Sequence, residues 1–170
     1  MRDAMVAALT LDIFNSHCDR VVMANIAQMV NVLQAVILTD GAQMICTPTY
    51  HVFDLYKAHH DANALPTAIT CDEQGGVRQL TATASEKDGV ITLTATNLSC
   101  TDALDVTVHL SGASAKDITA RILTGDMHDK NTFEHPEQVR VQPFDGIRKT
   151  ETGFTLTLPA CAVAEVTIRG

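Results

Sequence analysis

The run from Arg20 to Leu38, RVVMANIAQMVNVLQAVIL, constrains the fold of this chain more than any other stretch. It is the most apolar segment, yet it carries no charge after its first residue and includes four neutral amides: Asn25, Gln28, Asn31 and Gln34. A buried amide needs hydrogen-bond partners, so a simple core segment has little use for four of them. A membrane helix needs about 20 consecutive apolar residues, and the amides interrupt that pattern. We expect an inner element of a larger fold, with at least one amide facing a ligand.

Helical patterns lie on both sides of this run. Residues 2–15 repeat apolar side chains every four positions without Gly or Pro, which predicts a helix that is apolar on more than one side. Thr47 and Pro48 are typical of a helix start, with Thr47 as the N-cap, and this helix is expected to reach about His60. A helix, a turn and a buried run in this order predict an α/β unit, in which the run begins as an interior strand at Val21.

The character of the sequence changes at Pro66. Beyond it, short runs alternate apolar residues with threonine or charged residues, at 91–96, 104–110, 154–158 and 164–168. Strands of this length, apolar on one face and polar on the other, predict an antiparallel β-sandwich. We therefore predict two parts, an α/β unit at residues 1–65 that is too small to close a sheet, and a β-sandwich at residues 66–170.

Charge and cysteine content bear on the partners and the compartment. The 170 residues carry a net charge of −8, and lysine and arginine form no cluster, which argues against nucleic acid or an anionic membrane as partner. The five cysteines are dispersed with no CxxC pair, which favours reduced thiols in a cytoplasmic protein.

No cofactor or metal ion is expected. The histidines do not have the spacing of a zinc site. We favour surface or helix-end positions for His17, His51, His59 and His60. A polar turn with Asp126, His128 and Asp129 lacks the ligand spacing of an EF-hand.

Two long stretches resemble one known enzyme family. LTLDIFNSHCDRVVMANIAQMVNVLQAVILTDG, followed by TPTYHVFDLYKAHHDA, looks like the end of the catalytic domain of α-L-arabinofuranosidases of glycoside hydrolase family 51. TGDMHDKNTFEHPEQVRVQPFDGI is similar to the C-terminal domain of the same enzymes. The resemblance covers nearly the whole chain. It implies the end of a (β/α)₈ barrel followed by a jelly-roll-like β-sandwich.

On that template, residues 3–17 correspond to the seventh barrel helix, Val21 to about Gln28 to the eighth strand, and Pro48 to His60 to the eighth helix. The family releases terminal non-reducing α-L-arabinofuranosyl residues from polysaccharides or oligosaccharides with retention, through two glutamates on earlier barrel strands. This chain has no glutamate before Glu73, so its barrel portion cannot supply a retaining pair. We predict that the chain has no catalytic residue of its own and is inactive alone.

Gln28 is the predicted substrate-binding residue. The resemblance implies that its counterpart hydrogen-bonds the sugar in the −1 subsite, and an amide can donate and accept at once. The other interpretation is that Gln28 bonds backbone at the barrel rim. Asn25 and Asn31 are expected to satisfy backbone groups or neighbouring loops, because most side-chain hydrogen bonds go to backbone or water.

Two non-catalytic alternatives stay open: a stand-alone sandwich that binds sugar, and a module for subunit assembly. Sugar-binding modules stack their ligands on exposed aromatic rings. The chain has no tryptophan, and the aromatic residues of the predicted sandwich are Phe133, Phe144 and Phe154. We therefore favour a supporting domain, and the resemblance implies that it helps to assemble a homo-oligomer.

Overall fold

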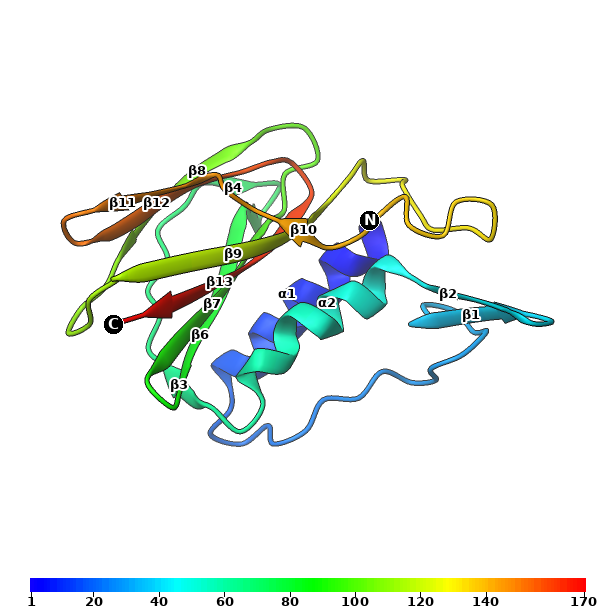
Figure 1. The fold of residues 1–170 in the computed structure, drawn as a ribbon, viewed down its shortest axis with the longest axis horizontal. Helices are drawn as coiled ribbons and strands as arrows, with labels where there is room; N and C mark the ends of the chain where they lie inside the picture. Colours follow the sequence, from blue (N-terminus) through cyan, green and yellow to red (C-terminus); the bar gives the residue numbers. More distant parts are fainter.

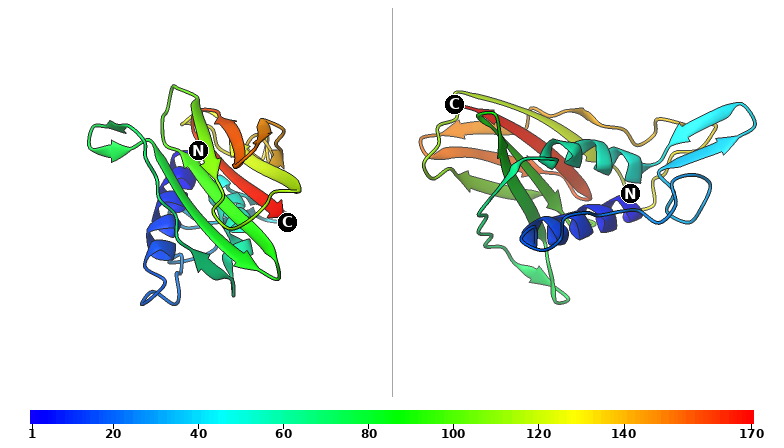
Figure 2. Two further views of the ribbon diagram at one scale, coloured as in Figure 1. Left: turned by 90° about the vertical axis from the view of Figure 1, so that its left-hand side faces the viewer. Right: turned by 90° about the horizontal axis from the view of Figure 1, so that it is seen from below.

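Two helices lie side by side against one face of a β-sheet in the computed structural model, which describes residues 1–170 (Figure 1). They are α1 (Arg2–Ser16) and α2 (Pro48–Tyr56), and a 3₁₀ turn, η1 (Lys57–His59), extends α2. Both helices run in the same direction (Figures 1 and 2). Their N-terminal ends point toward a hairpin of β1 (Ile37–Asp40) and β2 (Gln43–Cys46). Both predicted helices are confirmed.

Two larger antiparallel sheets form most of the rest of the molecule. The larger sheet has the strand order β10-β9-β13-β7-β6-β3. Its strands are β3 (Asn63–Leu65), β6 (Leu80–Lys87), β7 (Val90–Asn97), β9 (Asp117–Thr124), β10 (Gln142–Pro143) and β13 (Ala162–Arg169). The smaller sheet has the order β11-β12-β8, with β8 (Leu104–His109), β11 (Ile147–Thr150) and β12 (Gly153–Leu158). A short hairpin of β4 (Glu73–Gln74) and β5 (Val77–Arg78) stands apart.

The two sheets face each other across an apolar core. Phe154, Leu156 and Leu158 of β12 pack in one cluster with alternate residues of β13, among them Ala164 and Val166. Each of the four alternating runs of the sequence forms a strand, β7, β8, β12 or β13, so the predicted antiparallel sandwich is confirmed. Within the smaller sheet, β12 begins so close to its neighbour β8 that a Cβ on Gly153 would lie 2.1 Å from the carbonyl oxygen of Val108.

The outer face of the six-stranded sheet is covered by the helices. α1 packs on β6, β7 and β13, and α2 packs on β9 and β13. A second apolar cluster therefore joins helix residues such as Met5, Val52 and Leu55 to Leu123 and Val163 of the sheet. The threonines on this face are buried as well, and Thr94 and Thr96 have no exposed surface. Alternation in the sequence predicted this polar face but not the helices that cover it.

The strand expected from Val21 to about Gln28 is not formed. Residues 21–29 have no regular secondary structure, and the first pairing of the run is an isolated parallel bridge between Val30 and Ile37. A parallel strand needs a neighbouring strand to satisfy its backbone groups, and this chain places none beside residues 21–28. The end of the run instead turns at Gly41 and forms the β1–β2 hairpin.

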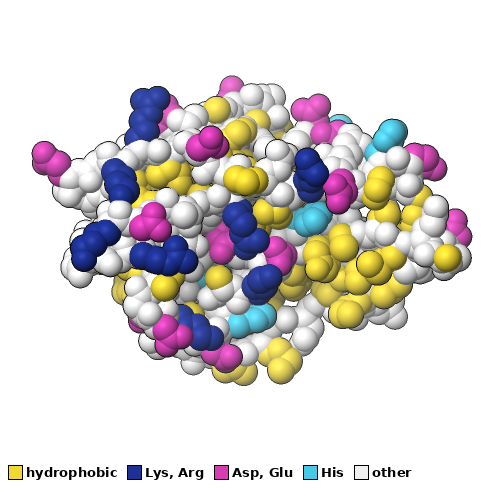
Figure 3. All heavy atoms as spheres, in the orientation of Figure 1, with side chains coloured by type: hydrophobic (Ala, Val, Ile, Leu, Met, Phe, Trp, Pro, Cys, Tyr) yellow, Lys and Arg dark blue, Asp and Glu magenta, His cyan; other side chains and the backbone are white.

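Because the run lacks neighbours, many of its apolar side chains face solvent. Val22 and Leu33 are each 93% exposed, and Met23 and Met29 are 73% and 60% exposed. Figure 3 shows hydrophobic side chains gathered on this side of the molecule, over β1, β2 and the segment before them.

Neither helix has the length and apolar content that a bilayer-spanning helix needs.

Candidate functional site

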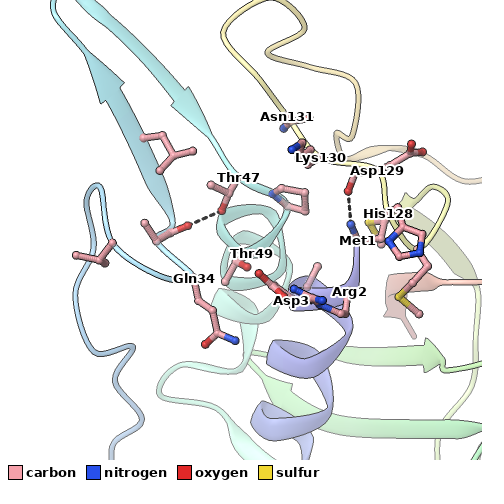
Figure 4. A pocket seen from close by; sticks show the side chains of 16 residues that line it. Met1, Arg2, Asp3, Gln34, Thr47, Thr49, His128, Asp129, Lys130 and Asn131 are labelled. Carbon is pink, nitrogen blue, oxygen red and sulfur yellow. Dashed lines mark hydrogen bonds and ion pairs between the residues drawn. The ribbon is translucent and has the colours of Figure 1, made fainter.

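A pocket of about 300 Å³ opens where the N-terminal ends of the two helices meet (Figure 4). Three parts of the chain form its wall. The first turns of the helices contribute Asp3 and Thr49, the apolar run contributes Gln34, and the loop after β9 contributes His128 and Lys130. This volume is at the lower end of the range of small-molecule sites, about 300–1,000 Å³.

Asn131 fixes the loop that carries His128 and Lys130. Its side chain is 5% exposed, and its amide nitrogen donates to the carbonyl oxygens of Cys46, at 2.8 Å, and Val139, at 2.9 Å. Its amide oxygen accepts the N–H of Val139 at 2.8 Å. The loop is therefore held against the end of β2 by one satisfied side chain.

Thr47 precedes α2 as expected, but its hydroxyl does not cap the helix. It donates to the carbonyl oxygen of Ala35 at 2.8 Å and so ties the helix start to the end of the apolar run (Figure 4). The backbone of Thr47 is extended, as an N-cap requires, so the position was predicted correctly and the bonding was not.

The polar groups of the pocket suit a hydroxyl-rich ligand better than a metal ion. An amide, threonine hydroxyls and a carboxylate can exchange hydrogen bonds with hydroxyl groups. No group of three His, Cys, Asp or Glu side chains is placed to hold a metal ion. Glutamate is absent from the pocket wall, so the pocket offers no glutamate pair for retaining hydrolysis.

The four amides of the run have different surroundings. Gln28 is exposed on the irregular segment and does not line the pocket, so its substrate-binding role stays a prediction. Asn31 has a φ of 55°, and its amide bonds both the hydroxyl and the N–H of Thr39, at 2.8 and 2.7 Å. Asn25 lines a smaller adjacent pocket of about 130 Å³, and Gln34 lines both pockets. Gln34 is thus the amide that the structure brings to the larger pocket, although its position in the apolar run does not distinguish it from the other three amides.

A buried carboxylate joins the helices to the sheet below the pocket. Asp12 of α1 is 5% exposed, accepts the hydroxyl of Tyr56 at 2.7 Å, and also accepts the hydroxyl of Thr81 on β6. Burial raises the pKa of Asp12 to about 6, although both hydrogen bonds favour its charged form. Burial and the neighbouring Asp12 also raise the pKa of Tyr56.

His59 fastens the end of α2 to the same face of the sheet. Its Nδ1 lies 2.7 Å from the Ser85 hydroxyl, and its Nε2 lies 3.1 Å from the Thr94 hydroxyl. Burial, with a smaller contribution from His60, lowers the pKa of His59 to about 4. The expected helix-end position is correct, but this histidine is partly buried and bonded to the sheet.

Arg121 of β9 makes the third connection. It pairs with Asp54 of α2 at 3.1 Å and with Glu165 of β13. The Glu165 side chain is only 8% exposed, so the arginine compensates a nearly buried charge. Together these contacts fix the helices, and hence the pocket wall, to the sandwich.

The sequence of residues 1–162 matches the family model of the α-L-arabinofuranosidase C-terminal domain. The chain belongs to this family. The matched region begins before α1, so the family domain includes the helices as well as the sandwich on which they pack. The family expected from the sequence resemblance is confirmed.

Individual relatives agree with this assignment. The chain is 40% identical over 176 residues to an intracellular exo-α-L-arabinofuranosidase of Bacteroides ovatus. The alignment covers 99% of this chain and 34% of that protein. The crystal structure of the family 51 arabinofuranosidase of Xanthomonas axonopodis pv. citri superposes with a TM-score of 0.90 and 40% identity, over 98% of this chain and 35% of that one. A family 51 α-L-arabinofuranosidase of Bifidobacterium longum gives a TM-score of 0.87 and 29% identity, over 98% and 34%. The chain thus spans about a third of the length of these relatives.

Proposed function

We propose that this family domain is the C-terminal portion of a retaining α-L-arabinofuranosidase. The parent enzyme releases terminal non-reducing α-L-arabinofuranosyl residues from arabinose-containing polysaccharides or oligosaccharides, without a cofactor. The observation that carries the proposal is the match along nearly the whole chain to arabinofuranosidases about three times as long. Three relatives are named as intracellular enzymes, which supports the same compartment for the parent.

In this proposal α1 and α2 are the last two helices of a (β/α)₈ barrel. Two helices that lie side by side in the same direction, with an apolar run between them in sequence, suit consecutive units of such a barrel. The run from Val21 to Gln28 becomes the eighth strand when neighbouring strands pair with it. The high exposure of Val22, Met23 and Leu33 supports this, because apolar side chains so exposed are suited to burial by further polypeptide.

The catalytic carboxylates of the parent come from outside this chain. All six glutamates of the chain lie after Pro66, on the sandwich side of the fold. A retaining mechanism needs an acid/base and a nucleophile about 5–5.5 Å apart across the sugar. The role proposed for this chain is substrate positioning. Gln28, at the end of the eighth strand, donates its amide N–H to a sugar oxygen and accepts a sugar hydroxyl.

A substitution at Gln28 in the parent enzyme tests this role. Gln28→Ala removes two hydrogen bonds to the sugar, and we expect kcat/KM to fall about 10- to 100-fold. Gln43→Ala is the matched control, because Gln43 is an exposed glutamine of β2 outside both pockets. Unchanged kinetics in Gln28→Ala would contradict the proposed role of Gln28 and leave the family assignment intact.

A sugar-binding sandwich without catalysis is the rival function. Such a module needs exposed aromatic rings, whereas Phe154 is fully buried and Phe133 and Phe144 are half-buried. We therefore expect the isolated chain not to be retained on immobilised arabino-oligosaccharides. The role that remains for the sandwich is to support the barrel and to contribute to a homo-oligomer.

A further inference from the structure

Cys100 and Cys161 lie on two loops that meet at one end of the six-stranded sheet. The strands β7 and β13 are neighbours, and their register ends with Asn97 opposite Ala162. Just beyond this pair, the N–H of Cys161 donates to the carbonyl oxygen of Ser99 at 2.8 Å. Because the Ser99 carbonyl and the N–H of Cys100 belong to one peptide group, this hydrogen bond brings Cys100 next to Cys161.

Asn97 holds both loops in place. Its buried amide nitrogen donates to the carbonyl oxygens of Asp102, at 2.9 Å, and Pro159, at 2.8 Å, which belong to the two loops. The hydrogen bond from Cys161 to the peptide group that joins Ser99 to Cys100 keeps the Cα atoms of the two cysteines at most about 6.5 Å apart. A disulfide requires a Cα separation of about 4.4–6.8 Å. The backbone positions thus suit a bond between Cys100 and Cys161 without a large movement.

The two thiols differ in access. Cys100 is exposed, whereas Cys161 is 1% exposed and belongs to the apolar cluster under α1. Burial raises the pKa of the Cys161 thiol, and the neighbouring Cys100 raises it further. An exposed thiol that reacts first, beside a less accessible thiol that resolves the product, is the arrangement of redox-sensitive cysteine pairs.

We propose that Cys100 and Cys161 form a reversible dithiol–disulfide pair that is oxidised by low-molecular-weight disulfides such as oxidised glutathione. The Cys100 thiolate attacks one sulfur of the oxidant, which forms a mixed disulfide and releases one glutathione thiolate. Cys161 then loses its proton, and its thiolate attacks the Cys100 sulfur and releases the second glutathione thiolate. Two protein thiols are oxidised while one glutathione disulfide is reduced to two thiols, so electrons balance. This modification is separate from the proposed hydrolase function.

Disulfide mapping tests the proposal. The native 170-residue chain is incubated with oxidised glutathione in mildly alkaline buffer, its remaining thiols are blocked, and it is digested without reductant for mass spectrometry. We expect the peptide pair linked through Cys100 and Cys161 to exceed any other cysteine pair by about tenfold or more, and to disappear after excess reduced glutathione. The same treatment of the chain unfolded in urea provides the reference, in which the five cysteines should pair without this preference.

Two variants sharpen the result. Cys18→Ser removes the other exposed thiol and should leave the Cys100–Cys161 linkage unchanged. Cys100→Ser should abolish the linked peptide pair, and Cys161 should form no disulfide with another cysteine instead. Native chain that shows no Cys100–Cys161 peptide, or shows it in no excess over the other pairs, would overturn the proposal.

Discussion

Asp12 is a carboxylate buried between a helix and a sheet, and its pKa predicts how the stability of the fold depends on pH. Its pKa is about 6 in the folded chain, against an ordinary value of 3.8. The folded state therefore favours the protonated form, and this contribution to stability is lost as pH rises through 6. With about 1.4 kcal/mol per pKa unit, the loss at neutral pH is about 3 kcal/mol.

The Asp12→Asn variant should therefore gain stability relative to the wild type as pH rises. An amide keeps an acceptor for Tyr56 and carries no charge. Urea unfolding of both proteins should show a difference in unfolding free energy that grows by about 2–3 kcal/mol, in favour of the variant, from pH 4 to pH 7. Asp40→Asn, at an exposed carboxylate, is the control. An Asp12→Asn difference that is the same at both pH values would contradict the expected pKa of Asp12.

His59 makes the opposite contribution. Its pKa is about 4 in the folded chain, against an ordinary value of 6.5, so the folded state favours the neutral ring. The stability that this ring contributes is complete above pH 6.5 and falls as pH decreases toward 4. His59→Gln, which can still bond Ser85, should gain up to about 3 kcal/mol relative to the wild type over that interval. His60→Gln, at the exposed neighbour, should show much less, and equal behaviour of the two variants would contradict the prediction.

Because the two groups act with opposite sign, the wild-type chain should vary less in stability between pH 4 and pH 7 than either variant. Differences between variant and wild type are therefore more informative than the pH profile of the wild type alone.

Among the elements, the contact between α2 and the sheet depends on Arg121. Arg121→Leu leaves Glu165, which is nearly buried, without its partner, and also removes the pair with Asp54. Arg121 is itself 41% exposed, so solvent screening reduces the effect, and we expect a loss of about 1–3 kcal/mol in the free energy of unfolding.

A second substitution and a surface pair serve as controls for Arg121. Adding Glu165→Gln should recover part of the loss, because no unpaired charge then remains buried. Arg140→Leu, which breaks an exposed pair with Glu137, should cost less than about 0.5 kcal/mol. An Arg121→Leu variant as stable as Arg140→Leu would contradict the proposed role of Arg121.

The elements that the sequence predicted correctly are those that local pattern determines. The helix at residues 2–16 and the strands β7, β8, β12 and β13 follow from their periodicity, and Thr47-Pro48 marks a true helix start. The prediction of a strand at residues 21–28 was wrong for this chain, because a parallel strand forms only beside neighbouring strands, which local sequence does not reveal. The burial of Thr94 was missed for a similar reason, since alternation separates two faces but does not show what covers each.

The pocket could not be predicted from spacing, because it joins residues that are distant in sequence. Asp3, Gln34, Thr49 and Lys130 meet only when both helix starts and the loop after β9 are assembled. The four amides were recognisable as unusual in an apolar run. Choosing between Gln28 and Gln34 requires the direction of each side chain, which depends on whether the run is a strand or an irregular segment.

For the whole molecule, the exposed apolar run predicts the behaviour of the chain alone. Val22, Met23 and Leu33 should drive concentration-dependent self-association, because apolar patches of this kind are buried when another surface is available. Replacing all three by serine should lower the association measured by analytical ultracentrifugation. Val77→Ser, at an exposed valine 52% accessible on β5, is the control and should have little effect. A monomer at all concentrations would contradict this prediction.

Turnover by the isolated chain tests the central claim most directly. The purified 170-residue chain and the proposed parent enzyme are assayed side by side for arabinose release from 4-nitrophenyl α-L-arabinofuranoside. We expect release by the proposed parent enzyme and none above the buffer blank by the chain alone, because the chain has no glutamate before Glu73 and its pocket has no glutamate pair. Turnover by the chain alone would contradict the account.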